Sequence, residues 1–174
     1  MLRSTAEFSD CGLFRWNLCR QWDEGPAVCF VMLNPSIAGA DVDDPTITRC
    51  IGFARAWGFG SLWVRNLSPF IATEPANLIR AMHRVDVSGG KRGTIELMAS
   101  CNASLLVAAW GNPATKAMVG RFLEIAGDKD IWCLGTTKAG SPKHPLYLKG
   151  DTLPIPFKGC DGKDWRDCLV RGAH

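Results

Sequence analysis

A carboxamide follows an unbroken apolar run in the first fifth of the chain. The run is AVCFVML at positions 27–33, and Asn34, Pro35 and Ser36 end it. Apolar runs without alternation are typical of strands buried on both faces of a parallel sheet. Pro35 lacks a backbone donor and biases Asn34 away from helical angles, so the chain must turn there. The sequence therefore places Asn34 at the carboxyl end of a central strand, where open α/β sheets bind their ligands.

Three later apolar runs also end in polar residues. Asn66 closes the second run, the turn after Trp110 closes the third, and His144 lies in the loop after the fourth. Parallel strands bring their carboxyl ends to one edge of a sheet. We therefore expect the two amides and the imidazole to converge on one hollow. The four strands are expected at 27–33, 62–66, 104–110 and 131–134.

Segments with helical spacing separate these strands. Pro45 suits the first position of a helix that Asp44 caps, and Gly58 follows its last apolar residue. Residues 12–22 alternate loosely before a turn signal, which favours an edge strand leading into the central one. Further helices are expected at 75–82, 91–101, 114–126 and, as a last short one, 164–170.

This alternation of strands and helices predicts an α/β fold. We expect a three-layer α/β/α sandwich whose central, mostly parallel sheet has four strands, with an N-terminal edge strand beside it. A chain of 174 residues fits one domain over 1–174. Its core is expected at 12–157, and the Pro- and Gly-rich end is expected to form an irregular tail at 158–174.

Composition narrows the functional classes. The sequence has no apolar run long enough to cross a bilayer and no signal-peptide pattern, so we expect a cytoplasmic monomer without membrane contact. The eight cysteines include no C-x-x-C pair and read as reduced thiols. An iron–sulfur site at Cys11, Cys19, Cys29 and Cys50 stays open. Phosphate-loop, dinucleotide and zinc-deaminase signatures are missing, so we expect no cofactor and no metal.

Three short motifs resemble those of the uracil-DNA glycosylase superfamily: MLNPS at 32–36, VRNL at 64–67 and HPLY at 144–147. Residues 25–157 are more closely similar to a bacterial and phage family, DUF1643-like, that carries MLNPS, DDPT and HPLYL boxes. The resemblance implies a DNA glycosylase that flips a base into its pocket. It implies that Asn34 orients a water molecule, that His144 donates to the departing base or its sugar–phosphate, and that Asn66 reads the base edge.

The same resemblance assigns supporting roles around the base. Substrate-binding positions are expected at Leu33, Pro35, Ser36, Asn66, Trp110 and Tyr147. DNA contacts are expected at Arg49, Ser68, Thr136, Thr137, Lys138, Lys143 and Leu146, with Leu146 and Tyr147 as wedges between stacked bases. The net charge of +3 does not by itself require a nucleic-acid partner, and on charge alone a solvated basic surface is the better explanation of the lysines.

Asp43 and Asp44 mark a departure from that pattern, because uracil-excising members carry an aromatic residue there. A carboxylate accepts a hydrogen bond from the exocyclic amine of cytosine but repels uracil O4. Asp43 is therefore expected to read a cytosine-like base or to act as general base, and Asp44 either caps a helix or enters the pocket. Hydroxymethylated or glucosylated phage cytosines become candidate substrates, which would give an antiviral role.

Two other functions fit the same residues. A nucleoside- or nucleotide-processing hydrolase would keep the pocket but turn over small molecules without salt-sensitive DNA binding. A non-catalytic module would bind modified bases without releasing them.

Overall fold

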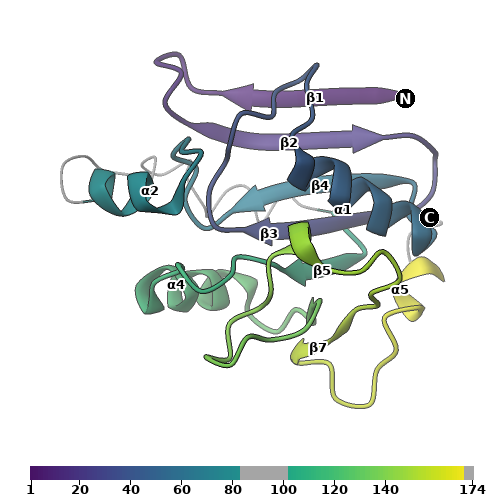
Figure 1. Ribbon diagram of the computed structural model, residues 1–174. Helices are drawn as coiled ribbons and strands as arrows, with labels where there is room; N and C mark the ends of the chain where they lie inside the picture. Colours follow the sequence, from purple (N-terminus) through teal and green to yellow (C-terminus); the bar gives the residue numbers. More distant parts are fainter. Residues whose placement is uncertain (83–101, 171–174) are drawn as a thin grey trace.

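The computed structural model describes residues 1–82 and 102–170, and its described strands form one seven-stranded sheet (Figure 1). The strand order across the sheet is β1-β2-β4-β3-β5-β6-β7. In chain order the strands are β1 (Arg3–Phe8), β2 (Arg15–Gln21), β3 (Ala27–Met32), β4 (Ser61–Asn66), β5 (Leu105–Ala108), β6 (Ile131–Cys133) and β7 (Ile155–Lys158). The helices are α1 (Pro45–Ala56), α2 (Pro75–Met82), α4 (Lys116–Ala126) and α5 (Asp167–Val170), and a short 3-10 helix, η2, spans Pro145–Tyr147.

The sheet is mixed, which confirms the α/β class and corrects the predicted sheet. Strand β3 pairs in parallel with β4 and β5, and β5 pairs in parallel with β6. The pairs β1–β2, β2–β4 and β6–β7 are antiparallel. The prediction of a mostly parallel four-stranded sheet is therefore wrong for the sheet as a whole, which is larger and has as many antiparallel as parallel pairings.

The predicted edge strand is also misplaced. Residues 12–22 contain β2, but β2 lies between β1 and β4, so β1 forms the edge. Strand β1 is largely exposed and carries no apolar run, which is why its sequence gave no signal. Strand β7 was not predicted either. It contains a proline and pairs at the opposite edge of the sheet, where proline is tolerated.

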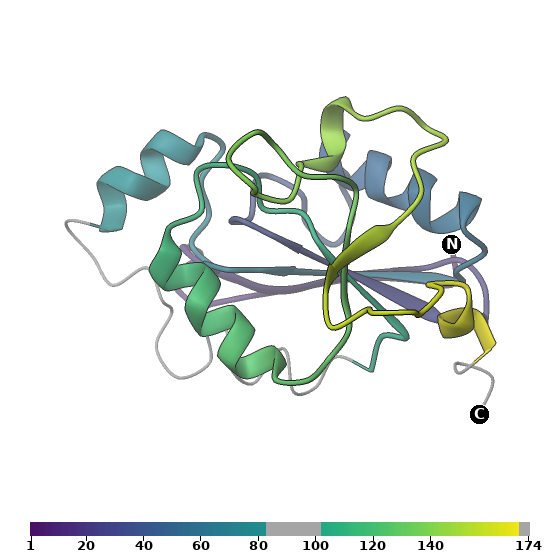
Figure 2. The same cartoon turned by 90° about the horizontal axis from the view of Figure 1, so that it is seen from below.

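Helices cover both faces of the sheet (Figure 2). On β3, Val28 and Phe30 pack in one apolar cluster with residues of α1, whereas Cys29 and Val31 pack in a second cluster with residues of α2 and α4. Successive side chains of a strand point to opposite faces, so burial on both faces requires an unbroken apolar run. The continuous run at 27–33 is explained by these two cores.

The caps of the helices agree with the sequence. The Asp44 side chain accepts a hydrogen bond from the Ile47 backbone at 2.8 Å, with Pro45 as the first helical residue. Thr115 caps α4 by accepting from the Met118 backbone at 3.2 Å. Helix α2 has the predicted bounds, and the helix predicted at 91–101 lies outside the described residues.

Candidate functional site

A cavity of about 670 Å³ opens where the parallel strands β3 and β5 end. Its walls come from the residues that follow these two strands, from the start of α1, and from the loop that joins β6 to η2. It lies at the edge where the sequence predicted a hollow. Ten of the predicted site residues line it: Leu33, Asn34, Ser36, Asp44, Trp110, Thr137, Lys143, His144, Leu146 and Tyr147. The cavity does not include Pro35, Asp43, Arg49, Asn66, Ser68, Thr136 or Lys138.

Asn34 presents its carbonyl oxygen as a free acceptor. Its amide nitrogen donates to the backbone oxygens of Pro35 at 2.9 Å and of Ala72 at 2.7 Å. Only the NH₂ group can satisfy two carbonyl acceptors, so these contacts fix which end of the amide is which. No described residue donates to Asn34 Oδ1. Asn34 is therefore held rigidly and keeps one acceptor for a ligand.

His144 is held as a neutral imidazole. Its Nδ1 accepts a hydrogen bond from the backbone of Leu146 at 3.4 Å and so caps η2. Burial lowers the pKa of His144 below its usual value, and the nearby Asp44 carboxylate acts in the opposite direction. A neutral ring that accepts at Nδ1 carries its proton on Nε2. The cavity therefore receives a hydrogen-bond donor from His144.

Asp44 fills both of the roles expected for it. One carboxylate oxygen caps α1 through the Ile47 backbone, and the residue also lines the cavity although it is only 8% exposed. Its charge acts on His144 and on Arg15, so the three side chains form one electrostatic group. Asp44 is thus the carboxylate of this site.

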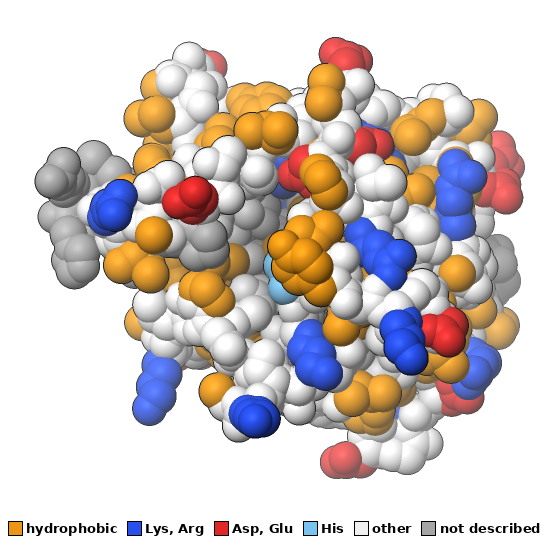
Figure 3. Space-filling model, in the orientation of Figure 1, with side chains coloured by type: hydrophobic (Ala, Val, Ile, Leu, Met, Phe, Trp, Pro, Cys, Tyr) orange, Lys and Arg blue, Asp and Glu red, His pale blue; other side chains and the backbone are white. Residues whose placement is uncertain are grey.

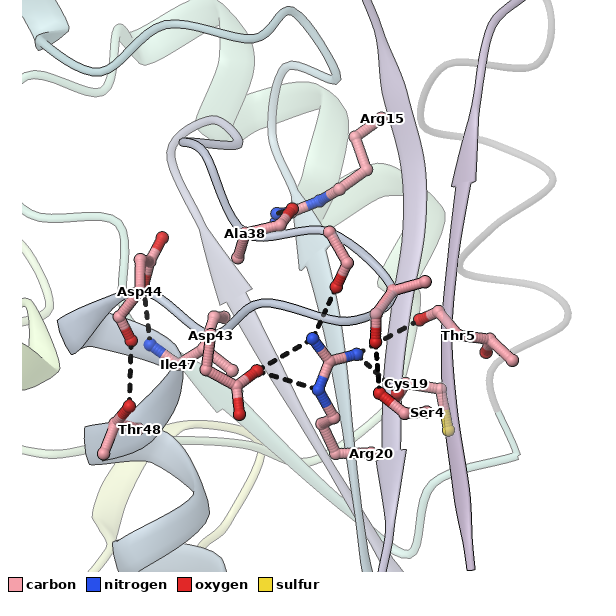
Figure 4. A network of polar contacts seen from close by, with 12 residues as sticks. Ser4, Thr5, Arg15, Cys19, Arg20, Ala38, Asp43, Asp44, Ile47 and Thr48 are labelled. Carbon is pink, nitrogen blue, oxygen red and sulfur yellow. Dashed lines mark hydrogen bonds and ion pairs between the residues drawn. The ribbon is translucent and has the colours of Figure 1, made fainter. Parts of the chain in front are cut away.

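Asp43 points away from the cavity, which corrects its assignment as base reader or general base. Its carboxylate contacts the guanidinium of Arg20 at 2.8 Å, as Figure 4 shows. Arg20 is 1% exposed and also donates to the backbone oxygens of Cys19 and Gly39 at 3.0 and 2.5 Å. Asp43 therefore neutralises a buried cation and ties the loop before α1 to strand β2.

Replacing Asp43 by alanine should lower stability. The change leaves the buried Arg20 charge without its anionic partner, at a cost of about 2 kcal/mol because Asp43 itself is partly solvated. For a domain of this size, that corresponds to a fall in Tm of roughly 4–8 °C. Differential scanning calorimetry measures it, with Asp41→Ala as the matched control, since Asp41 is an exposed carboxylate in the same loop. Equal melting of both variants would contradict the structural role of Asp43.

Three more predicted residues are buried away from the cavity. Asn66 is 7% exposed at the end of β4, and its Oδ1 has no hydrogen-bond partner among the described residues. Ser68 is 1% exposed and accepts from the Phe70 backbone at 3.3 Å, so it cannot contact a DNA phosphate. Pro35 is buried as well. These positions follow strands as predicted, but their side chains point into the protein.

The predicted DNA contacts divide in a similar way. Arg49 bonds the backbone oxygen of Leu148 and stacks over the Phe53 ring, so it anchors the segment after η2 to α1. Thr136 and Lys138 are exposed in the loop that follows β6, outside the cavity wall. Basic side chains are scattered over the face drawn in Figure 3, with acidic side chains between them. Lys143 is exposed to solvent and also lines the cavity.

Three residues that line the cavity were not predicted from the sequence: one arginine and two threonines. Arg15, Thr46 and Thr73 all line the cavity. Arg15 belongs to β2 and is distant in sequence from the polar residues that follow the predicted strands. The one signal was a basic residue between two aromatic ones in a strand-like segment. Its place in the wall depends on β2 lying next to β4, which the sequence did not predict.

The described residues give no group of three or more histidine, cysteine, aspartate or glutamate side chains that could hold a metal ion. Cys19, Cys29 and Cys50 are buried whereas Cys11 is exposed, so these four do not form the iron–sulfur site that was left open. Within residues 1–82 and 102–170, no helix is both long and apolar enough to span a bilayer.

A family model matches most of the chain. The family is DUF1643, described as a protein of unknown function, and the match covers residues 15–146. No curated protein matches the chain, and no solved structure matches it. The matched residues include Arg15, Asn34, Asp44 and His144, which surround the cavity.

Proposed function

The chain belongs to the DUF1643 family, and we propose that it is a DNA glycosylase acting on a flipped-out, modified pyrimidine. One observation carries the proposal: a single cavity at the carboxyl ends of parallel strands brings together Asn34, Asp44 and His144. These supply a fixed acceptor, a carboxylate and a neutral donor. Hydrolysis of an N-glycosidic bond needs these three functions to orient water, to stabilise the sugar cation and to stabilise the leaving base.

The positions of the motifs support the same proposal. In the uracil-DNA glycosylase superfamily, which the sequence resembles, the water-orienting motif follows the first core strand and a His-Pro motif follows the fourth. Here MLNPS follows β3, and the His-Pro pair follows β6. The helices packed on both faces of the sheet also support a three-layer α/β/α sandwich. Asn66 departs from that pattern because it does not line the cavity.

The carboxylate and the amide act on the sugar side of the bond. Asn34 Oδ1 accepts a hydrogen bond from a water molecule and positions it for attack on C1′. Asp44 removes the proton of that water and stabilises the positive charge that develops on the sugar. An asparagine cannot act as a base of useful strength, so the buried carboxylate at the helix start supplies the proton acceptor.

His144 acts on the base side of the bond. Its Nε2–H donates to an oxygen of the base as that base takes up the electron pair. A neutral donor suits this step, because burial disfavours the imidazolium.

The size of the cavity favours a substituted pyrimidine. Its volume of about 670 Å³ lies in the upper half of the roughly 300–1,000 Å³ typical of small-molecule sites. Hydroxymethylated or glucosylated cytosines of phage DNA are therefore the preferred candidates, and their excision would serve antiviral defence.

The rim of the cavity suits DNA. Tyr147 is 89% exposed although it lines the cavity, and Leu146 lies beside it in η2. Aromatic and apolar side chains at a rim can replace the stacking partner that an extruded base leaves behind. Lys143 supplies a cation next to them for the flanking phosphate.

A panel of DNAs tests the function. The protein is incubated with genomic DNAs that carry cytosine, hydroxymethylcytosine, glucosylated hydroxymethylcytosine or uracil, and with the matching free nucleosides and nucleotides. Alkali-sensitive sites and released bases are then measured by gel and mass spectrometry. We expect release from a modified-cytosine DNA by the wild-type protein only, with Asp44→Asn as the inactive control. Turnover of the free compounds alone would favour the small-molecule hydrolase, and salt-sensitive binding without release would favour the binding module.

Two variants of His144 should separate its roles. His144→Asn keeps an acceptor near Nδ1 for the Leu146 backbone but loses the Nε2 donor, so we expect single-turnover excision to fall roughly 10- to 100-fold at nearly unchanged Tm. His144→Gln can place an amide donor near Nε2 but loses the cap, so we expect a lower Tm and a smaller loss of excision. Full excision by His144→Asn would contradict the donor role.

The same residue predicts a pH dependence. Because burial lowers the pKa of His144 in the folded chain, the unfolded chain binds the proton at higher pH. Stability therefore falls as the pH drops below the ordinary histidine pKa of about 6.5, and this loss is absent above it. The His144→Asn variant should lack this part of the acid-side fall in Tm.

A further inference from the structure

Arg15 is a buried cation whose hydrogen bonds are incomplete. It is 2% exposed and lines the cavity. Its Nη1 donates to the backbone oxygen of Ala38 at 2.7 Å (both residues are labelled in Figure 4), whereas its Nε is sealed from solvent and has no partner among the described residues. No described acidic side chain forms an ion pair with it, although the charge of Asp44 acts on it across the site.

Arg20, on the same strand, shows what a satisfied buried arginine looks like. It contacts the Asp43 carboxylate and the backbone oxygens of Cys19 and Gly39. Burial lowers the pKa of Arg15 to about 10, so Arg15 remains charged at neutral pH. A buried charge without a counter-charge is costly, and unsatisfied buried donors are rare. Because the Arg15 side chain lines the cavity, an anionic ligand bound there can supply the missing counter-charge.

We infer that Arg15 is the anion-binding residue of the cavity and that its ligand is the pyrimidine ring that becomes an anion during excision. This inference rests on the proposed function. The guanidinium would donate hydrogen bonds to the pyrimidine O2. Its planar fork of N–H donors suits oxygens that carry negative charge. The leaving base would then accept hydrogen bonds from two donors, the neutral His144 and the charged Arg15.

The bond between C1′ of the sugar and N1 of the pyrimidine breaks, and both electrons pass to N1 and are shared with O2. Water forms the new bond to C1′, and its proton passes to Asp44. Arg15 binds the ring anion until the anion takes a proton from solvent. Arg15 and Asp44 thus carry the charges opposite to those that develop on the base and on the sugar.

Binding of free pyrimidines to the whole protein tests the inference. Barbiturate is a pyrimidine that is an anion at neutral pH, whereas uracil is a neutral ring of nearly the same shape. Isothermal titration calorimetry should show tighter binding of barbiturate than of uracil to the wild-type protein. The Arg15→Met variant should bind barbiturate roughly 10- to 100-fold more weakly and lose the preference. Arg20→Met should melt at a lower temperature but keep the preference, because Arg20 does not line the cavity.

Three further measurements test whether Arg15 itself binds the anion. Arg15→Lys keeps the charge without the planar fork and should prefer barbiturate with reduced affinity. In the wild-type protein, the ¹⁵N-resolved Nε–H signal of Arg15 should shift with barbiturate and not with uracil. Arg15→Met should melt at or above the wild-type temperature, because it removes an uncompensated buried charge. Equal binding of both rings, tighter binding of inorganic phosphate than of barbiturate, or an unmoved Nε–H signal would overturn the inference.

The test of Arg15 can fail or succeed independently of the test for glycosylase activity. If no DNA in the panel releases a base but barbiturate binding depends on Arg15, the anion site stands and the glycosylase proposal fails. If a base is released equally by the wild-type protein and Arg15→Met, the glycosylase proposal stands and the role of Arg15 fails.

Discussion

Asp44→Asn should lower single-turnover excision by roughly 10²- to 10⁴-fold, the usual range for losing a general acid–base group. Asparagine is as good a helix cap as aspartate, so the contact with the Ile47 backbone and the start of α1 should survive. We therefore expect the Tm to stay close to that of the wild-type protein. The measurement is the rate of base release with protein in excess over the modified DNA, together with the melting curve of the same preparation.

Asp44→Ala is the matched variant for the cap. It removes the charge and the acceptor together, so it should lose the same activity and in addition about 1 kcal/mol of stability. If Asp44→Asn released base at the wild-type rate while Asp44→Ala lost only stability, Asp44 would be a helix cap and nothing more. The described residues would then give the site no catalytic carboxylate, because Asp43 contacts Arg20 instead.

Asn34→Ala should lower excision roughly a hundredfold or more, because it removes a preorganised acceptor for the attacking water. It also removes two hydrogen bonds to backbone oxygens, of Pro35 and of Ala72. Stability should therefore fall by about 1–2 kcal/mol, since part of each bond is regained from water. Single-turnover rates must be compared at a temperature where the variant is fully folded.

A control for this destabilisation comes from the same loop. Asp43→Ala should lose a comparable amount of stability, but its side chain lies outside the cavity. We expect it to keep both the excision rate and the choice of base. If Asp43→Ala lost as much activity as Asn34→Ala, the fall would reflect a loosened loop, and the role of the Asn34 oxygen in orienting water would be contradicted.

The two arginines of β2 show how closely function and stability are linked here. Arg15 and Arg20 are both almost completely buried, yet among the residues that the structure describes only Arg20 has a carboxylate in contact. The chain satisfies one cation internally and leaves the other incomplete at the wall of a cavity. Such a deficit lowers the stability of the empty protein and raises its affinity for an anionic ligand. An excess of ligand should therefore stabilise the protein, by an amount that grows with the logarithm of the ratio of ligand concentration to Kd.

Local sequence determined the central elements of this protein. The apolar run at 27–33 predicted β3, because a strand buried on both faces needs apolar residues at every position. Pro45 and Asp44 predicted the start of α1. The first residue of a helix has no use for a backbone N–H, which proline lacks, and an aspartate before it can accept a hydrogen bond from a free backbone N–H of the first turn. Asn34 and His144 were found because polar residues after parallel strands meet at one edge.

Tertiary structure decided the remainder. Strand β1 and strand β7 carry no apolar run, so their pairing depends on backbone contacts that a one-dimensional pattern does not encode. Asp43 and Asp44 are neighbours in sequence, but the position of Arg20 turns one toward β2 while the other enters the cavity. Arg15 reaches the same cavity only because β2 pairs with β4. Which charges are paired and which are left for a ligand is a property of three-dimensional packing, because a charge is neutralised by whatever lies within a few ångströms of it and not by its neighbours along the chain.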